Sequence, residues 1–275
     1  MTIPWNKIGA AIFDLDGTLY EDTHHFDYYA KQLEEKLPEH KHPSFWKDYN
    51  KMMRGDHPIA IGRVYDTTRD RILEIHPETY QVMKTWNWEG DVVSEGEDYK
   101  EPVRFDFDTM IAIGDGWWPP VAAAKHYGVG STFDAYKATK LYMQTEAFQF
   151  AEHPERRESL LRLQQYMTLV LLTNSQADDV EQLLTTLDLQ GVFHDVIPNA
   201  QKPAQTSNQF TAVMKKYNLS PDQVVSIGDN YLNDIIPAEN LGMHSVLIDS
   251  QGRTRTRSNT VRIRSLSDLF PLINL

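Results

Sequence analysis

The sequence predicts an α/β protein whose core is a doubly wound parallel sheet, with an inserted, mainly α-helical second domain. From about residue 155 onward, strand and helix patterns alternate with short connections. This is typical of right-handed β-α-β units with helices on both faces of a parallel sheet. An apolar run at residues 8–13, much earlier in the chain, fits a buried strand of the same sheet. Residues 20–150 lack the alternation, so we expect them to form the insert.

The elements of the sheet follow one another in the second half of the chain. Val180, Leu183, Leu184 and Leu187 recur at helical spacing, and Gly191 follows them as a helix terminator. Short apolar runs bounded by polar residues predict strands. The predicted helices are 155–166, 176–188, 205–217 and 231–241, and the predicted strands are 168–172, 192–197, 224–227 and 245–248.

The insert has a different texture, rich in aromatic and charged residues. We expect a mainly helical domain with a small β element at residues 21–151, between core segments 1–20 and 152–275. The expected elements are helices at 24–37, 65–75, 121–127 and 133–150, with strands and turns at 90–113.

The composition fits a globular protein of 275 residues, long enough for a domain plus a second, smaller one. The sequence contains no cysteine, which excludes disulfides and thiolate metal sites. No apolar run approaches the ~20 residues that a membrane-spanning helix needs, and the N-terminal residues lack the apolar stretch of a signal peptide. We therefore expect a cytoplasmic protein without a membrane partner.

The formal net charge is −12, from 39 acidic and 27 basic residues. A field of this sign repels phosphate backbones, so nucleic-acid polymers are disfavoured as partners. The basic cluster of Arg253, Arg255 and Arg257 with Arg262 and Arg264 is interpreted as a solvated loop and a strand edge. An acidic protein that handles a small anion must supply local positive charge from a metal, a lysine or backbone amides.

The strand at 8–13 ends abruptly in Asp14-x-Asp16-Gly17-Thr18. Strand alternation sends the side chains of Asp14 and Asp16 to the same side. Two ionised carboxylates so close repel each other, and a divalent cation or a proton held by one of them removes that repulsion. Taken alone, the motif is also compatible with a strand followed by an ordinary Asp-Gly turn.

Polar residues also follow the predicted strands at 168–172 and 192–197. Thr173-Asn174-Ser175 offers a hydroxyl and an amide beside the N–H groups of the next helix, which suits a phosphate oxygen. Taken alone, this stretch is favoured as an N-cap. Lys202 lies in the loop after the second strand, where it could neutralise phosphate charge and hold an aspartate nucleophile. Most lysines are simply solvated, and that alternative stays open for Lys202.

The predicted strand at 224–227 delivers Asp229 to the same sheet edge, and Asp234 follows about one helical turn later. Ligands bind at the carboxyl edge of open α/β sheets. Mg²⁺ takes oxygen ligands and keeps several waters, so Asp14, Asp229 and a backbone carbonyl would suffice to hold it. Helix-capping acids are the alternative for this segment.

A similar run, Ile113-Gly114-Asp115, lies within the insert. Trp117-Trp118-Pro119-Pro120 follows it, with no second acid nearby and no clean strand-to-helix junction. Asp115 is therefore assigned to a turn of the insert.

The four signals occur together in the order Asp-x-Asp, Thr-Asn, Lys-Pro and Gly-Asp-x4-Asp, each at a strand end of one sheet. In this combination the chain resembles the haloacid dehalogenase (HAD) superfamily, of the phosphatase-like kind. The match covers residues 8–20 and roughly 155–250. The resemblance implies a Rossmann-like HAD core and a cap domain inserted after the first motif.

The resemblance also implies a role for each residue. Asp14 would attack phosphorus and form an aspartyl-phosphate, and Asp16 would act as general acid and then as general base. Mg²⁺ would be held by Asp14, the backbone carbonyl of Asp16 and Asp229, with Asp234 as a further ligand or an anchor. The phosphoryl group would be bound by Thr173, Asn174 and Lys202.

An acid at residue 16 suits oxygen leaving groups, as the resemblance implies, so we expect a Mg²⁺-dependent phosphatase acting on a small phosphorylated metabolite. A phosphomutase with the same residues and a non-catalytic protein that binds a phosphometabolite or a partner stay open as alternatives. We expect a monomer or a homodimer. Residues of the insert that are candidates for contacting the substrate, though each is more typical of a surface residue, are His24, His25, Arg54, His57 and Arg63.

Overall fold

A computed structural model describes residues 3–151, 153–250, 252 and 260–273. The chain divides into two compact units, which are described separately. Unit 1 comprises Met1–Asp22 and Gln149–Leu275, and unit 2 comprises Thr23–Phe148. Within the described residues, no helix combines the length and apolar character needed to cross a membrane. The basic positions Arg253, Arg255 and Arg257 lie outside the described residues.

Unit 1 is built on a six-stranded sheet in which every pair of neighbouring strands is parallel. Strand β1 lies between β7 and β9, in the middle of the sheet. The predicted parallel α/β core is therefore confirmed. In spatial order the strands are β11 (Val261–Ile263), β10 (His244–Ile248), β9 (Val224–Gly228), β1 (Ala10–Phe13), β7 (Thr168–Leu172) and β8 (Asp195–Ile197).

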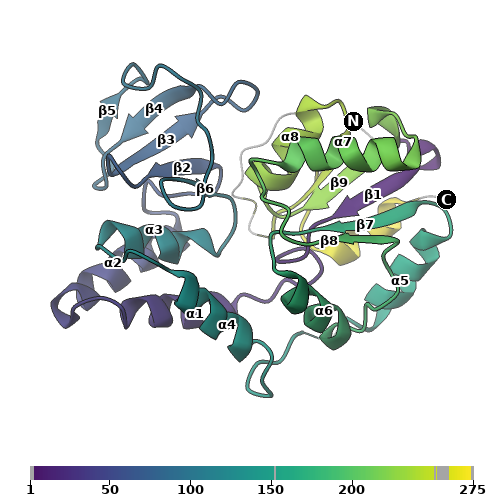
Figure 1. Ribbon diagram of the computed structural model, residues 1–275, viewed down its shortest axis with the longest axis horizontal. Coiled ribbons are helices and arrows are strands. Elements are labelled where there is room, and N and C mark those ends of the chain that lie inside the picture. The colour runs from purple at the N-terminus through teal and green to yellow at the C-terminus, as the bar shows by residue number, and fades with distance from the viewer. Residues whose placement is uncertain (1–2, 152, 251, 253–259, 274–275) are drawn as a thin grey trace. The chain divides into compact units, whose positions relative to one another are not determined.

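Helices cover both faces of this sheet. Figure 1 shows α5 and α6 on one face and α7 and α8 on the other, which makes the sheet doubly wound. The face toward α7 is apolar because alternate strand residues such as Ala10, Ile12 and Val170 pack with Phe210 and Val213 of that helix. The helices are α5 (Pro154–Gln164), α6 (Ala177–Thr186), α7 (Thr206–Tyr217) and α8 (Ile236–Asn240).

The chain after β9 departs from the predicted helix at 231–241. A π-helical turn occupies Tyr231–Ile235, and α8 is confined to Ile236–Asn240. Asn230 caps the turn, since its side chain accepts a hydrogen bond from the N–H of Asn233. Single π turns are frequent at functional sites, and this one begins two residues after Asp229, which directly follows β9.

Unit 2 is an α+β domain, and its sheet is larger than the small β element expected. Five antiparallel strands lie in the order β5-β4-β3-β2-β6. The strands are β2 (Arg63–Asp66), β3 (Arg71–Ile75), β4 (Val82–Trp86), β5 (Val92–Ser94) and β6 (Met110–Ile113). The helices are α1 (His24–Glu34), α2 (His42–Arg54), α3 (Trp118–His126) and α4 (Phe133–Tyr142).

The predicted helix at 65–75 is wrong, because that segment forms the hairpin of β2 and β3. The buried carboxylate of Asp66 accepts hydrogen bonds from the N–H groups of Thr68 and Arg69. Asp70 has a φ of 52°, which turns the chain back. This local turn chemistry reverses the chain between Asp66 and Asp70 and so favours a hairpin over a continuous helix.

Two of the expected surface residues of the insert are buried. His25 packs beside Trp117 and His57 beside Trp88, with ring centroids 4.8 Å and 4.7 Å apart. Asp115 does lie in a turn, where its Oδ1 accepts a hydrogen bond from the N–H of Trp117 at 2.8 Å. That turn joins β6 directly to α3, so the expectation of no strand-to-helix junction there is wrong.

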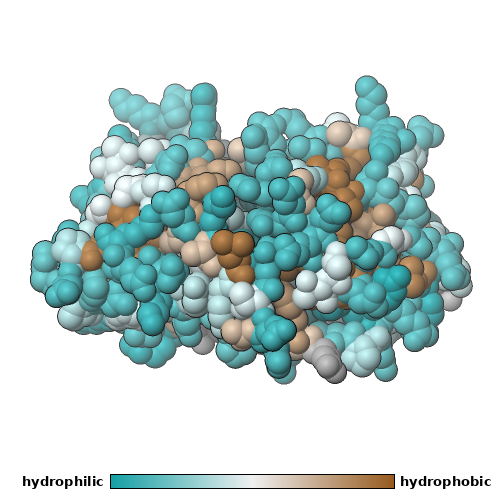
Figure 2. Space-filling view, turned by 60° about the horizontal axis from the view of Figure 1, so that its bottom comes forward, coloured by the Kyte–Doolittle hydropathy of each residue, from teal (hydrophilic) through white to brown (hydrophobic). Residues whose placement is uncertain are grey.

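The molecular face drawn in Figure 2 is mainly hydrophilic, with hydrophobic residues in separate patches. Exposed large apolar side chains include Phe133 and Leu141 of α4 and Val92 and Val93 of the edge strand β5.

Candidate active site

The carboxyl ends of three neighbouring strands of unit 1 bring the predicted motifs together. Phe13 of β1 pairs with Leu171 of β7 on one side and with Ile227 of β9 on the other. Asp14 and Asp229 therefore leave adjacent strands at the same edge. The chain leaves β1 toward β7 and β8 and later returns to the other side of β1 with β9. Such a reversal of strand order is where open α/β sheets bind ligands.

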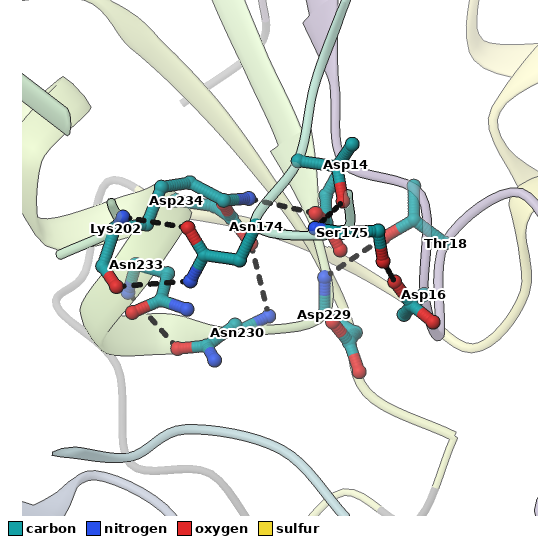
Figure 3. A network of polar contacts seen from close by, with 11 residues as sticks. Asp14, Asp16, Thr18, Asn174, Ser175, Lys202, Asp229, Asn230, Asn233 and Asp234 are labelled. Atoms are coloured by element: carbon teal, nitrogen blue, oxygen red, sulfur yellow. Dashed lines mark hydrogen bonds and ion pairs between the residues drawn. The ribbon is translucent and has the colours of Figure 1, made fainter. Parts of the chain in front are cut away.

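Lys202 lies between two of the predicted acids (Figure 3). Its Nζ is 2.7 Å from Oδ1 of Asp14 and 2.6 Å from Oδ1 of Asp234. All three residues are buried, and Lys202 is only 2% exposed. The alternative of a solvated lysine is therefore wrong, because its charge is compensated within the site.

Burial raises the pKa of Asp14 to about 7, against the opposing effect of the Lys202 ammonium and with further increases from the carboxylates of Asp234 and Asp16. Burial disfavours the charged form of Lys202 as well, but Asp14 and Asp234 outweigh that effect and raise its pKa. The lysine thus stays protonated, and it is Asp14 whose charge is sensitive to its surroundings.

Asp14, Asp229 and Asp234 each offer a carboxylate oxygen, and these oxygens lie within 4.8 Å of one another. When all three are ionised, the single ammonium of Lys202 leaves an excess of two negative charges. A buried excess of this size is costly. Three carboxylates with this excess of negative charge suit a hard divalent cation such as Mg²⁺, which prefers oxygen ligands. The residues present therefore fit the predicted metal.

Two glycines let the carboxylates approach. Gly17 has a φ of +78°, and a Cβ there would lie 2.1 Å from Oδ2 of Asp229. A Cβ at Gly228 would lie 2.3 Å from Oδ2 of Asp234. The π turn brings Asp234 back toward its own start, where Oδ2 accepts a hydrogen bond from the N–H of Asn230 at 3.3 Å. Both glycines are therefore required by close packing against acidic side chains.

Thr173-Asn174-Ser175 does not cap α6. The N-cap is Gln176, and its side chain makes no capping hydrogen bond. Asn174 instead reaches the Lys202 loop, donating from Nδ2 to the Lys202 carbonyl at 2.9 Å and accepting from the Lys202 N–H at 2.7 Å. The buried Thr173 accepts a hydrogen bond from the N–H of Ser175 at 3.1 Å. The N-cap alternative is therefore wrong, and Asn174 fixes the backbone that carries Lys202.

Asp16 accepts two hydrogen bonds from residues that were not singled out as site residues. Ser175 Oγ donates to Oδ2 at 2.8 Å (Figure 3). The Tyr20 hydroxyl donates to Oδ1. Thr18 was also missed; its Oγ1 accepts a hydrogen bond from the N–H of Asp229 at 3.1 Å. Thr18 belongs to the Asp-x-Asp-Gly-Thr motif and Ser175 to the Thr-Asn-Ser motif, so their positions in the sequence could have identified them. No motif residue pointed to Tyr20.

Comparisons with known proteins agree with this geometry. The family model of the haloacid dehalogenase-like hydrolases matches residues 8–242. The chain is similar to a glyceraldehyde 3-phosphate phosphatase of Pyrococcus furiosus, with 30% identity over 38% of this chain and 45% of that protein. It is also similar to a phosphoglycolate phosphatase of Aliivibrio fischeri, with 33% identity over 34% of this chain and 42% of that protein. The matches span less than half the length of both relatives.

Solved structures share the fold across the whole chain. The HAD-hydrolase YfnB from Bacillus subtilis has a TM-score of 0.55 at 14% identity, covering 98% of this chain and 99% of that one. A HAD phosphatase from Thermococcus onnurineus has a TM-score of 0.54 at 15% identity, covering 97% and 98%. With the family model spanning both units and the motifs meeting at one sheet edge, the chain belongs to the haloacid dehalogenase-like hydrolases.

Proposed function

We propose that this hydrolase is a phosphatase that cleaves a monoester of a small phosphorylated metabolite through an aspartyl-phosphate on Asp14. The observation that carries the proposal is the buried contact of Asp14 with Lys202 beside two further acids. A carboxylate held next to a fixed cation is suited to attack an anionic phosphate, because the cation offsets the charge of the incoming group. Both curated relatives are phosphatases by name, which supports the same reaction class.

Two residues of the loop after β1 perform the bond changes. An Asp14 oxygen attacks phosphorus while the bond from phosphorus to the ester oxygen breaks, and Asp16 gives its proton to that leaving oxygen. Asp16, now a carboxylate, takes a proton from a water that attacks the aspartyl-phosphate. Inorganic phosphate leaves, Asp14 is regenerated, and Asp16 is again protonated.

Three residues from the neighbouring loops bind the phosphoryl oxygens in this proposal. Lys202 supplies the fixed positive charge. Thr173 uses its oxygen to accept from Ser175, which leaves its hydroxyl hydrogen for a phosphoryl oxygen. Asn174 donates one amide hydrogen to the Lys202 carbonyl and has a second to offer. Losing one such donor typically costs about 3 kcal/mol of transition-state stabilisation.

Asp14, Asp229 and Asp234, with the backbone carbonyl of Asp16, would hold Mg²⁺. When bound, the ion supplies positive charge that offsets the repulsion between the Asp14 carboxylate and the phosphate.

Unit 2 is proposed to be the cap domain that selects the substrate, inserted between the core segments of unit 1. We keep the expectation of a cytoplasmic enzyme, monomeric or homodimeric. The proposed substrate class is a small phosphorylated metabolite, since the acidic chain disfavours a nucleic-acid polymer.

The test is phosphate release from a panel of phosphorylated metabolites, with Mg²⁺ and with EDTA. The wild-type protein should release phosphate only with the metal, and Asp14→Asn should release none while keeping its far-UV circular dichroism. Asp195→Asn is the matched control, since Asp195 also pairs with a lysine, Lys216 at 2.6 Å, but on the surface of unit 1. Activity above a few per cent in Asp14→Asn would refute the nucleophile, and no release by the wild type from any ester would refute the phosphatase.

A further inference from the structure

Both carboxylate oxygens of Asp16 are held by hydroxyl groups from different parts of unit 1. Tyr20 donates to Oδ1, and Ser175 donates to Oδ2 at 2.8 Å. Tyr20 lies four residues after Asp16, whereas Ser175 follows β7, 159 residues away in the sequence. We propose that Tyr20 and Ser175 are positioning residues that fix the Asp16 carboxyl group for proton transfer. This inference rests on the proposed function, in which Asp16 is the acid and base.

Tyr20 is a rigid support. Its side chain is 1% exposed, and its ring meets Phe150 edge to face with centroids 5.1 Å apart. The preceding carbonyl, that of Leu19, accepts a hydrogen bond from a guanidinium N–H of Arg156 at 2.5 Å. A phenol buried this deeply is costly without a hydrogen-bond partner, and the Asp16 carboxylate provides one.

Ser175 is equally well fixed. It is 3% exposed, its N–H donates to Thr173 Oγ1 at 3.1 Å, and its carbonyl accepts from the N–H of Asn199 at 3.0 Å. These two bonds hold the backbone of Ser175 on both sides, and the bond to Asp16 orients its hydroxyl. Asp16 is therefore clamped between the phenol of Tyr20, whose backbone forms a β-bridge with that of Asp16, and the alcohol of Ser175, whose backbone is held by other residues.

Hydroxyl groups suit a residue that gains and loses a proton. Each can donate to a carboxylate and can turn to accept from a carboxylic acid. The same two residues can therefore hold Asp16 while it donates to the leaving oxygen and while it accepts from water. A side chain that only donates, such as lysine, could not accept a hydrogen bond from the protonated oxygen of the carboxylic acid.

If Tyr20 and Ser175 (the clamp) direct the Asp16 proton to the leaving oxygen, the activity lost on removing either hydroxyl must depend on the leaving group. 4-Nitrophenolate departs readily without a proton, whereas unsubstituted phenolate leaves less readily and gains more from proton transfer. The two aryl phosphates have similar size. Comparing their kcat/KM values therefore isolates the contribution of leaving-group protonation. Tyr20→Phe and Ser175→Ala should each lower kcat/KM on the order of tenfold for phenyl phosphate, a part of what general acid catalysis provides. The loss for 4-nitrophenyl phosphate should be about twofold or less.

The chain offers a matched control for each variant. Tyr217 donates its hydroxyl to Asp195 at 2.6 Å, and Ser245 donates to Glu239 at 3.0 Å, so Tyr217→Phe and Ser245→Ala remove the same kind of bond elsewhere in unit 1. Both control variants should leave kcat/KM unchanged for the two esters. Adding Tyr20→Phe to Asp16→Asn should cause no further loss, because Tyr20 acts through Asp16.

Three outcomes are distinguishable. A selective loss for phenyl phosphate that disappears in the Asp16→Asn background supports the clamp. An equal loss for both esters, or none, overturns the clamp while the phosphatase proposal stands. If wild-type protein hydrolyses neither these esters nor any metabolite of the panel, the proposed function itself has failed.

Discussion

The ammonium of Lys202 is shared by Asp14 and Asp234, at 2.7 Å and 2.6 Å, in a site that water barely reaches. One buried cation thus holds the proposed nucleophile and a proposed metal ligand at the same time. A buried pair of this kind gives little net stability, but removing one member leaves an uncompensated charge. Lys202 therefore connects the stability of unit 1 with its proposed chemistry.

Lys202→Met should destabilise unit 1 by about 3–5 kcal/mol, because it leaves buried carboxylates without their counter-charge. It should also slow phosphate release by about a hundredfold or more, since the fixed charge that binds the phosphoryl group is lost. Urea unfolding followed by circular dichroism measures the first effect. Lys216→Met is the control: Lys216 is 58% exposed and pairs with Asp195 at 2.6 Å, and exposed pairs contribute about 0–1 kcal/mol. Equal losses in the two variants would contradict the special position of Lys202.

Mg²⁺ should stabilise the protein more strongly as the pH rises. The pKa of Asp14 rises from its ordinary 3.8 to about 7 through burial. The folded state without metal therefore holds a proton on Asp14 that the unfolded chain has released, so this stabilisation fades as the pH rises from about 4 through about 7. Metal binding needs the carboxylate, so the gain from Mg²⁺ should grow over the same interval.

The measurement is the thermal midpoint with Mg²⁺ and with EDTA, from about pH 5 to about pH 8. At a hundredfold excess over Kd the ion should add about 2.7 kcal/mol, or roughly 5–10 °C for a chain of this size. Asp14→Asn should lose both the gain and its pH dependence. A gain that is flat with pH in the wild type would exclude Asp14 from the metal site.

Much of the core could be predicted because its signals are local. The apolar run ending at Phe13 and the run 168–172 carry strand residues followed at once by polar ones, and both strands form where expected. In unit 2 the same approach failed at 65–75, where the carboxylate of Asp66 and the positive φ of Asp70 outweigh helical spacing. Side-chain to backbone bonds of this kind are invisible to periodicity.

The site shows the same division. Asp14 and Asp229 follow strands directly, so parallel pairing suffices to bring them together. Asn174 was expected to cap a helix when considered alone, but its partner is the Lys202 backbone 28 residues further along. Tyr20 could not be singled out, because its role depends on how the loop after Asp16 folds back. Sequence patterns over a few residues cannot predict contacts that form only in the tertiary structure.

Gly17→Ala should disrupt the site, since a Cβ would lie 2.1 Å from the Asp229 carboxylate in addition to the strain of a φ of +78°. Gly55 has a φ of +80°, and a Cβ there would meet no atom of the described residues within 4 Å, so Gly55→Ala bears the strain alone. Each variant should lose about 1–2 kcal/mol to the left-handed backbone. Only Gly17→Ala should also lose phosphate release and the thermal shift with Mg²⁺. Parallel losses in both variants would contradict the contact with Asp229.

Unit 2 should lose stability in mild acid through His57. Burial lowers the pKa of this imidazole from 6.5 to about 4, with Asp48 opposing and Lys51 and His126 adding to the shift. Between these two values the unfolded chain binds a proton on His57 that the folded state does not bind. The free energy of unfolding is therefore at its maximum above about pH 6.5 and falls as the pH drops toward about 4. At about pH 5 the loss should be about 2 kcal/mol.

Tryptophan fluorescence is the suitable probe, because five of the six tryptophans lie in unit 2 and the ring of Trp88 is 4.7 Å from that of His57. Urea unfolding at about pH 7 and about pH 5 gives the difference in unfolding free energy. His57→Gln should remove most of that difference even if it lowers stability at both pH values, whereas His40→Gln, at an exposed position, should keep it. A pH dependence that survives His57→Gln would assign the acid sensitivity of unit 2 to another group.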